Sequence, residues 1–211
     1  MDETSLGPLL SPFGVTLTAQ QARSLLVYVD LLMRWNQRIS LTAIRSPEEC
    51  VTRHFGESLF LASCLPLNGR LLDVGSGAGF PGLALKIVAP ELAVTLLEPV
   101  AKKRAFLKEV ARACGFDRVE VRSERLEDYL RLPPPARFDT VTARAVGEVE
   151  ELAKDSARCL APGGRLCLWL GERQRVRLIS QALGFTWDTP IELPLGRERQ
   201  ILVGRKMPEE P

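Results

Sequence analysis

The feature that most constrains the fold is a series of short apolar runs, spaced along the last two thirds of the chain. They read RLLDV (70–74), AVTLLE (93–98), RVEVRS (118–123), FDTVTA (138–143) and RLCLWL (165–170). Between them, the sequence predicts helical segments over about 81–89, 101–114, 124–130 and 147–160. Short apolar strands that alternate with helices are typical of a parallel sheet whose two faces are both covered.

The end of the chain adds a different kind of connection. Two further candidate strands, 185–193 and 199–206, follow each other with no room for a helix between them. A direct connection of this kind joins antiparallel strands, so we expect a hairpin at the sheet edge. Residues 67–211 are therefore predicted to form one α/β domain with a mostly parallel seven-stranded sheet and a C-terminal antiparallel hairpin.

The segment before the first strand is predicted to be helical. Residues 18–36 carry a helical apolar stripe, and Thr18 is a suitable N-cap for it. A second helix is expected from Ser46 to about residue 62, with Pro47 at its first helical position. We therefore expect residues 1–66 to form a helical cap that belongs to the same compact unit as the sheet domain.

Composition narrows the class of protein. The 211 residues are 45% hydrophobic and 26% charged with a formal net charge of +2, as in soluble globular proteins. The start, MDETSLGPLL, is unlike a signal peptide, and no apolar window approaches the length of a membrane span. Five scattered cysteines without a CxxC pair, and one histidine, indicate reduced thiols in a cytoplasmic protein, with no metal site and no disulfide framework.

The first predicted strand runs into a glycine-rich loop, LLDVGSGAGFPG. Its last three glycines, Gly77, Gly79 and Gly82, have the spacing of the dinucleotide fingerprint, in which bare backbone contacts a pyrophosphate. Its first three, from Gly75 to Gly79, follow Asp73 as in the loops that bind S-adenosylmethionine. A plain glycine turn in a doubly wound sheet is a third interpretation.

Two of three features favour S-adenosylmethionine over a dinucleotide, and the third, Glu98, is neutral between them. Asp73 is expected to point into the ligand crevice, where a carboxylate suits the ammonium of a methionine moiety and repels a pyrophosphate. Glu98, at the end of the second strand, can accept hydrogen bonds from ribose hydroxyls of either ligand. The terminal hairpin leaves no second domain for the substrate of a dehydrogenase.

Each of these residues also has a structural interpretation. Asp73 can cap the loop, and Glu98 can be a solvated strand end. Phe80, directly after Gly79, can form a wall of the cofactor site or belong to the core.

The residues after the fourth strand bear on the methyl acceptor. They read Thr-Ala-Arg-Ala, which is unlike the box that accompanies methylation of exocyclic amines, and no cysteine is placed for attack on a pyrimidine. Methylation of a ring nitrogen with a free lone pair, such as N7 of guanine, needs neither that box nor a nucleophilic cysteine. Arg144 is the candidate catalytic residue, because a guanidinium can grip guanine O6 or a phosphate. A surface arginine paired with Glu148 or Glu150 is the alternative.

Six segments carry a family resemblance: RWNQRISLTAI (34–44), RHFGESL (53–59), LDVGSGAGFPGLALKIVAP (72–90), LLEPVAKKRAFLKEV (96–110), RLEDY (125–129) and FDTVTARAV (138–146). With these segments the chain resembles, nearly from end to end, the bacterial 16S ribosomal RNA guanine-N7 methyltransferases, the ribosomal small subunit methyltransferase G (glucose-inhibited division protein B) family. The resemblance implies a Rossmann-like fold and a cytoplasmic enzyme that uses S-adenosylmethionine to form 7-methylguanosine. It also implies cofactor contacts at Gly75, Phe80, Leu126, Glu127 and Arg144.

The chain departs from the family's usual pattern at two positions. Glu57 stands where the family usually has Asp, which lengthens the side chain by one methylene. Leu170 stands where the fifth strand of the family usually has Lys, at a position expected near the substrate entrance. By hypothesis, Arg173, Arg175 or Arg177, just beyond, replaces that lysine.

Basic residues mark the expected contacts with RNA. The candidates are Lys102, Lys103 and Arg104 on the helix after the second strand, and Arg53 and His54 in the cap. Solvated helix faces, and for His54 a structural role, are the alternatives. The protein is expected to be a monomer, and its expected partner is 16S ribosomal RNA, or the small ribosomal subunit or its precursor. A methyltransferase of another substrate and a non-catalytic NAD-binding module remain competing hypotheses.

Overall fold

One mixed β-sheet runs through the computed structural model, which describes residues 1–133, 136–144, 147–181, 183–196 and 199–208. Its strands are β1 (Arg70–Val74), β2 (Ala93–Leu97), β3 (Val119–Arg122), β4 (Phe138–Arg144), β5 (Leu160–Gly171), β6 (Phe185–Trp187), β7 (Ile191–Glu192) and β8 (Arg199–Lys206). Seven of them lie in the order β3-β2-β1-β4-β5-β8-β6, and β7 pairs separately with β8. Ala145, in the segment that follows β4, lies outside the described residues.

The strand directions confirm the predicted sheet. Strands β1 to β5 are all parallel, and β8 is antiparallel to β5, β6 and β7. Two details differ from the prediction. The expected single strand 185–193 is split before Pro190, a residue that has no N–H for a ladder hydrogen bond. The last strand, β8, lies inside the sheet between β5 and β6, and β6 forms the edge.

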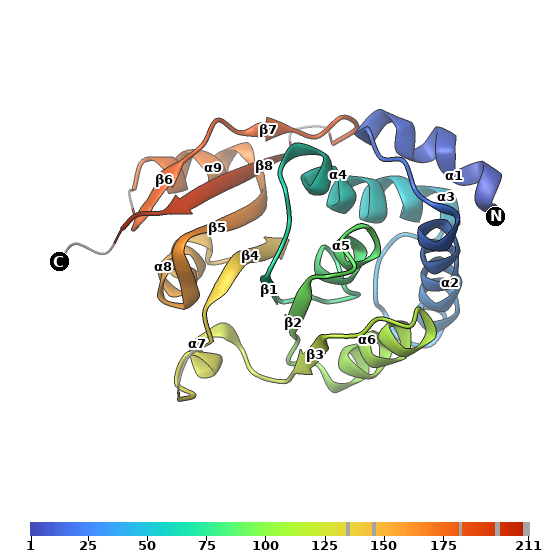
Figure 1. Cartoon of the computed structure of the whole chain (residues 1–211), viewed down its shortest axis with the longest axis horizontal. Helices are drawn as coiled ribbons and strands as arrows, with labels where there is room; N and C mark the ends of the chain where they lie inside the picture. The colour runs from blue at the N-terminus through green and yellow to red at the C-terminus, as the bar shows by residue number, and fades with distance from the viewer. Residues whose placement is uncertain (134–135, 145–146, 182, 197–198, 209–211) are drawn as a thin grey trace.

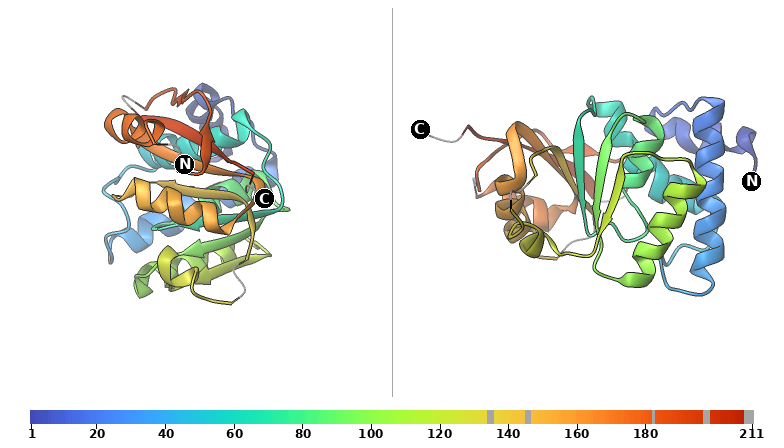
Figure 2. Two further views of the ribbon diagram at one scale, coloured as in Figure 1. Left: turned by 90° about the vertical axis from the view of Figure 1, so that its left-hand side faces the viewer. Right: turned by 60° about the horizontal axis from the view of Figure 1, so that its bottom comes forward.

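The helices are α1 (Glu3–Leu10), η1 (Ser11–Phe13), α2 (Ala19–Asn36), α3 (Pro47–Cys50), the π-helical turn η2 (Val51–Gly56), α4 (Glu57–Cys64), α5 (Gly82–Val88), α6 (Ala101–Ala113), α7 (Leu126–Tyr129), α8 (Val149–Cys159) and α9 (Glu172–Ile179). Helices α1 to α6 lie on one side of the sheet and α7 to α9 on the other (Figures 1 and 2). The sheet is thus covered on both faces, as its apolar strands predict.

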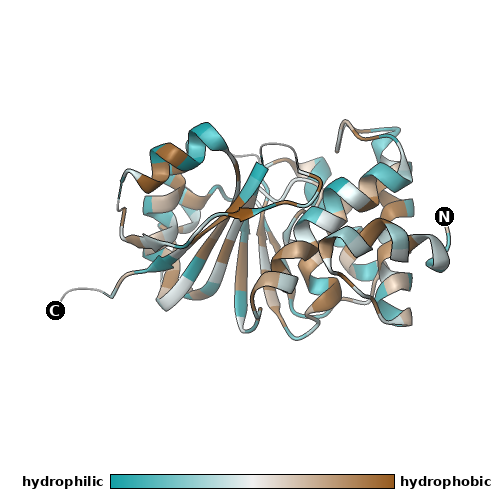
Figure 3. Ribbon diagram, turned by 90° about the horizontal axis from the view of Figure 1, so that it is seen from above, coloured by the Kyte–Doolittle hydropathy of each residue, from teal (hydrophilic) through white to brown (hydrophobic). Residues whose placement is uncertain are grey.

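Alternation along the strands builds two separate cores. Leu71 and Leu96 belong to the cluster that contains α2, α4, α5 and α6, whereas their neighbours Leu72 and Leu97 belong to the cluster with α8. Successive side chains of a strand point to opposite faces, so a continuous apolar run fills both cores. Figure 3 shows hydrophobic residues concentrated along the central strands and the inward sides of the helices.

The N-terminal helices begin where the sequence predicts. Thr18 caps α2 in a capping box, in which Gln21 N–H donates to Thr18 Oγ1 at 3.3 Å and Thr18 N–H donates to Gln21 Oε1 at 2.9 Å. The predicted second helix starts at Ser46 and continues through α3, η2 and α4, with a π-helical turn that periodicity alone cannot indicate. Helix α1 was not predicted, because Gly7 and Pro8 are poor helix formers.

Tyr28 on α2 joins the N-terminal helices to the sheet. Its fully buried hydroxyl donates to the carbonyl of Ala78 at 2.5 Å, and its ring stacks on Phe80 at 5.4 Å between centroids. Residues on both sides of position 66 therefore share one core, and the proposed boundary there stays a prediction. Within the described ranges, no helix has the length and apolar character needed to cross a membrane.

Candidate cofactor and substrate site

The order of the strands reverses between β1 and β4, and the glycine loop leaves β1 at this point. In open α/β sheets, ligands bind at such a switch point, beyond the carboxyl ends of the strands. Gly75, Gly77 and Gly79 all have positive φ, at 68°, 56° and 90°. This conformation is easily adopted only by glycine, so the loop sequence fixes its shape.

The space around the glycines separates two roles. A side chain at Gly79 would overlap the hydroxyl of Tyr28, and one at Gly82 would collide with Asp73. A side chain at Gly75 would meet no atom within 4 Å, and one at Gly77 only a carbonyl at 3.8 Å. Gly79 and Gly82 are therefore needed for packing, whereas Gly75 and Gly77 leave backbone open to a ligand.

A groove of about 750 Å³ lies beside Gly75, within the size range of ligand pockets. It contains Gly75, Leu126 and Glu127, three residues that the sequence analysis proposed for the cofactor. Its apolar lining includes Val74 and Leu97. The remaining charged residues that line it are Glu124, Arg125, Glu148, Glu151, Lys154 and Asp155. Carboxylates outnumber cations in this set, which favours a positively charged ligand over a pyrophosphate.

Asp73 is buried behind the glycine loop, with 1% of its surface exposed. Its carboxylate accepts hydrogen bonds from the Thr142 hydroxyl at 2.7 Å and from Gly82 N–H at 3.2 Å. Burial raises the pKa of Asp73 to about 6, against the lowering effect of these hydrogen bonds. These contacts are those of a loop-capping carboxylate, and a ligand role for Asp73 stays a prediction.

Glu98 ties the loop to the end of β2. It is 3% exposed, and its two carboxylate oxygens accept hydrogen bonds from Gly77 N–H at 2.9 Å and Val100 N–H at 2.8 Å. The interpretation of Glu98 as a solvated strand end is therefore wrong. Each oxygen retains a second lone pair, so the carboxylate can also accept a ligand hydroxyl.

The side chain of Phe80 lies in the core and does not line the groove. Its ring stacks between Tyr28, at 5.4 Å, and His54, at 4.7 Å between centroids. The ring fills the space between the cap helices, which agrees with the interpretation of Phe80 as a core residue. A contact of Phe80 with the cofactor stays a prediction.

Arg144 ends β4 and takes part in a buried ion-pair network. Its Nη2 donates to the carboxylate of Glu57 at 2.9 Å and to the carbonyl of Arg53 at 2.8 Å. Arg199 on β8 donates two hydrogen bonds to the same carboxylate, at 2.5 and 2.9 Å. The backbone carbonyl of Glu57 accepts from the Trp169 indole at 2.9 Å. Three distant segments are thus held together at one glutamate.

This network corrects the alternative interpretation of Arg144. The side chain is only 14% exposed and pairs with Glu57 rather than with Glu148 or Glu150. Burial lowers the pKa of Arg144, while Glu57 opposes that effect. Its Nη1 is buried and has no hydrogen-bond partner among the described residues. One donor of the guanidinium is therefore left without an acceptor, in a position that solvent does not reach.

Leu170 does not lie at an entrance. It is 2% exposed in the core on the side of α8, because it points away from the face that carries Trp169. The expectation for this position is therefore wrong. Of the arginines proposed as replacements, Arg177 pairs with Glu150 at 2.7 Å, and Arg175 lies 3.9 Å from Glu172.

The candidate RNA contacts in the cap are mainly engaged internally. Arg53 pairs with Glu49 at 2.8 Å, and Nε2 of His54 shares a hydrogen bond with the Thr42 hydroxyl at 2.7 Å. Burial first, and then the charge of Arg144, lower the pKa of His54 to about 3. His54 is thus neutral near pH 7 and is not a phosphate-binding cation. A contact of either residue with RNA stays a prediction.

The basic residues on α6 differ from one another. Arg104 donates to the carbonyls of Glu98 and Pro99, at 3.0 and 2.6 Å, and so stabilises the turn after β2. Lys102 is exposed and Lys103 half-buried. A contact of Lys102 or Lys103 with RNA stays a prediction. In the part of the chain that the structure describes, no cluster of histidine, cysteine or acidic residues could hold a metal ion, and all five cysteines are free thiols.

Comparison with known proteins identifies the family. Residues 21–186 match the family described as rRNA small subunit methyltransferase G, GidB. The chain belongs to this family. Proteins named ribosomal RNA small subunit methyltransferase G are 41% identical in Halorhodospira halophila, over 92% of both chains, and 34% identical in Syntrophotalea carbinolica, over 98% of this chain and 99% of the relative. The resemblance drawn from the sequence motifs is thus confirmed.

Solved structures confirm the fold class. The glycopeptide N-methyltransferase MtfA, solved in complex with S-adenosylmethionine, superposes with a TM-score of 0.59 and 18% identity, over 74% of this chain and 94% of its own. The YcgJ protein of Bacillus subtilis gives a TM-score of 0.58 and 16% identity, over 74% of this chain and 100% of its own. The GidB family member described here therefore has the Rossmann-like fold of S-adenosylmethionine-dependent methyltransferases.

Proposed function

We propose that this protein transfers a methyl group from S-adenosylmethionine to N7 of a guanine in 16S ribosomal RNA. The observation that carries the proposal is the acidic groove beside Gly75 at the switch point of the sheet, in a chain of the rRNA small subunit methyltransferase G family. The sulfonium and ammonium groups of S-adenosylmethionine are positive, so they suit this groove better than the pyrophosphate of NAD does.

The residues that line the groove or lie directly beside it fit the cofactor. The open backbone at Gly75 and Gly77 would hold the methionine moiety, and the Glu98 carboxylate, at the end of β2, would accept the ribose hydroxyls. Leu126 and Glu127 would lie beside the adenine. When bound, the cofactor supplies a methyl group that is already activated by its sulfonium.

The chain itself has to orient the acceptor. The N7 lone pair of guanine is free, so the reaction requires no general base, and in-line positioning alone can supply about 7–11 kcal/mol of the barrier. The unpartnered Nη1 of Arg144 is buried in this structure; once exposed by movement of the groups that cover it, it would donate to guanine O6 and leave N7 free to attack. Glu57 would hold that guanidinium in place through its 2.9 Å ion pair.

The test is methyl transfer from labelled S-adenosylmethionine to small subunits from cells that lack this methylation, followed by nucleoside analysis. We expect label in 7-methylguanosine, reduced about a hundredfold in Arg144→Ala, as when one preorganised donor is removed from an active site. Arg23→Ala, an exposed change outside the groove, serves as the control. Label in another nucleoside would contradict the assignment of guanine N7 as the methyl acceptor. Binding of NAD but not of S-adenosylmethionine would contradict the assignment of the cofactor. Monomeric state and cytoplasmic location remain expectations.

A further inference from the structure

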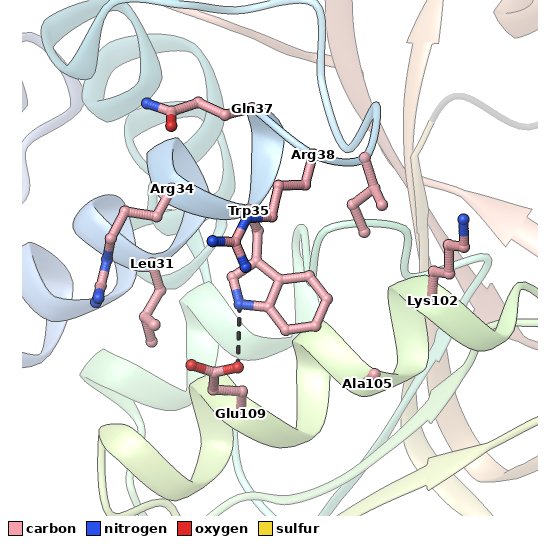
Figure 4. A pocket seen from close by; sticks show the side chains of 9 residues that line it. Leu31, Arg34, Trp35, Gln37, Arg38, Lys102, Ala105 and Glu109 are labelled. Atoms are coloured by element: carbon pink, nitrogen blue, oxygen red, sulfur yellow. Dashed lines mark hydrogen bonds between the residues drawn. The ribbon is translucent and has the colours of Figure 1, made fainter.

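A second groove, of about 580 Å³, lies between the end of α2 and the outer side of α6, apart from the cofactor groove. Its lining includes Arg34, Trp35 and Arg38 on one side, and Lys102, Ala105 and Glu109 on the other (Figure 4). The groove brings together basic residues of two segments that are far apart in the sequence. It also contains an aromatic ring, which the sequence analysis did not connect with these charges.

Trp35 is held in a fixed orientation in this groove. Its indole N–H donates to the carboxylate of Glu109 at 3.0 Å, and its ring packs edge-on against Phe106 at 5.7 Å between centroids. The ring is half-buried, and Figure 4 shows its six-membered part directed toward the small side chain of Ala105. An indole fixed along its edge, next to a small residue, leaves a face on which a flat ligand can stack.

The charges around the indole are mainly positive and largely available. Arg34 pairs with Asp30 at 2.7 Å, but both side chains are mostly exposed, so this pair is weak. The side chains of Arg38 and Lys102 are exposed, and neither side chain forms a hydrogen bond or ion pair with a described residue. Among the described residues that line the groove, Glu109 is the only acidic one, and it already accepts from Trp35.

Fixed aromatic rings among available cations are the means by which proteins bind single-stranded nucleic acid. We propose that this groove binds an unpaired nucleotide of the RNA substrate, with its base stacked on Trp35 and its phosphates beside Arg38 and Lys102. The proposal rests on the proposed function, since it concerns the same RNA. The acidic cofactor groove and this basic groove thereby take ligands of opposite charge.

The position of the groove supports an extended contact with the RNA. Lys102 lies in the first turn of α6, and Pro99, just before that helix, lines the cofactor groove. The two grooves are therefore about one helical turn apart at Pro99 and Lys102. One RNA strand can extend from the carboxyl ends of the strands to the basic groove. A protein segment with an apolar face is a poorer match, because three cations line the opening.

The test uses the full-length chain and a single-stranded 16S-derived oligonucleotide, with binding measured by fluorescence anisotropy at several salt concentrations. The double variant Arg38→Ala/Lys102→Ala removes the two available cations. Lys108→Ala, an exposed change on the same helix outside the groove, is the matched control. We expect the double variant to bind about tenfold more weakly. The slope of log K against log salt should become about 1.4 less steep, since each phosphate contact on single strands contributes about 0.7.

A second variant tests the stacking. Trp35→Leu keeps an apolar side chain but removes the flat face, so RNA affinity should fall between fivefold and a hundredfold. Its S-adenosylmethionine affinity and unfolding temperature are measured alongside, because loss of the bond to Glu109 also affects packing. RNA binding by the double variant equal to that of Lys108→Ala would overturn the proposal. Formation of 7-methylguanosine by the parent tests the proposed function separately, so the two failures are distinguishable.

Discussion

Replacement of Glu57 by Gln should destabilise the protein far more than an ordinary loss of a surface charge. Glu57 is 1% exposed and accepts three charge-assisted hydrogen bonds, one from Arg144 and two from Arg199. Removing one partner of a buried ion pair leaves the other charge uncompensated, which costs about 3–5 kcal/mol of unfolding free energy. For a chain of this size, that corresponds to a fall of roughly 6–20 °C in unfolding temperature.

The assay is urea and thermal unfolding of the parent, Glu57→Gln and a matched control. Glu49→Gln is that control, because Glu49 lies in the same helical region but pairs with Arg53 while 43% exposed. A surface pair of this kind contributes about 0.3–0.5 kcal/mol. A loss below about 1 kcal/mol in Glu57→Gln would refute the reasoning, since the network would then contribute no more than an exposed pair.

Two further variants separate charge from geometry. Glu57→Asp keeps the carboxylate but shortens its reach by one methylene, so it should retain more stability than Glu57→Gln. The double variant Arg199→Ala/Glu57→Ala should lose less unfolding free energy than the sum of the two single variants, because the two side chains form one ion pair. Additive losses would show that the ion pair carries no coupling.

Three other predictions concern the glycine loop and the residues packed against it. The pKa of Asp73 is about 6 in the folded chain and 3.8 in model peptides, so its contribution to stability is present below pH 3.8 and lost as pH rises through about 6. The unfolding free energy of the parent should therefore fall by about 3 kcal/mol as pH rises. Asp73→Asn should not show this fall when urea unfolding is measured from pH 4 to 7. Gly75→Ala should weaken S-adenosylmethionine binding with little change in unfolding temperature. Gly79→Ala should lower the unfolding temperature markedly, because its methyl group would overlap Tyr28. Both are measured by calorimetry, and equal effects of the two changes would show that the roles of the two glycines are not separate. His54→Asn should leave the shape of the pH–rate profile between pH 5.5 and 8 unchanged, because His54 stays neutral there, and a lost limb would contradict this.

The sheet was predictable because its strands are buried on both faces. Strands such as β1 and β2 therefore read as continuous apolar runs, and their bounds match the predicted runs within a residue. The start of β5 was not predicted, because Gly163 and Gly164 are typical of a turn rather than a strand. Local propensity identifies the elements, but it does not show where pairing continues through unfavourable residues.

The candidate site was also predictable only in part. Gly75, Leu126 and Glu127 were proposed from the loop motif and the family resemblance, and the structure brings them to one groove. The link between Glu57 and Arg199 spans 142 residues, so no local pattern indicates it. The available signal was an acid at the start of an apolar helix, ESLFLASC, since a buried carboxylate requires a partner.

The position of β8 inside the sheet has a consequence for how the molecule is made. A chain is synthesised from its N-terminus, and its domains fold as units as they emerge from the ribosome. Glu57 and Arg144 are made long before Arg199, yet Arg199 supplies two of the three hydrogen bonds to the Glu57 carboxylate. The Glu57 network can therefore be completed only after β8 is inserted, so the proposed acceptor site around Arg144 would be among the last parts of the molecule to form.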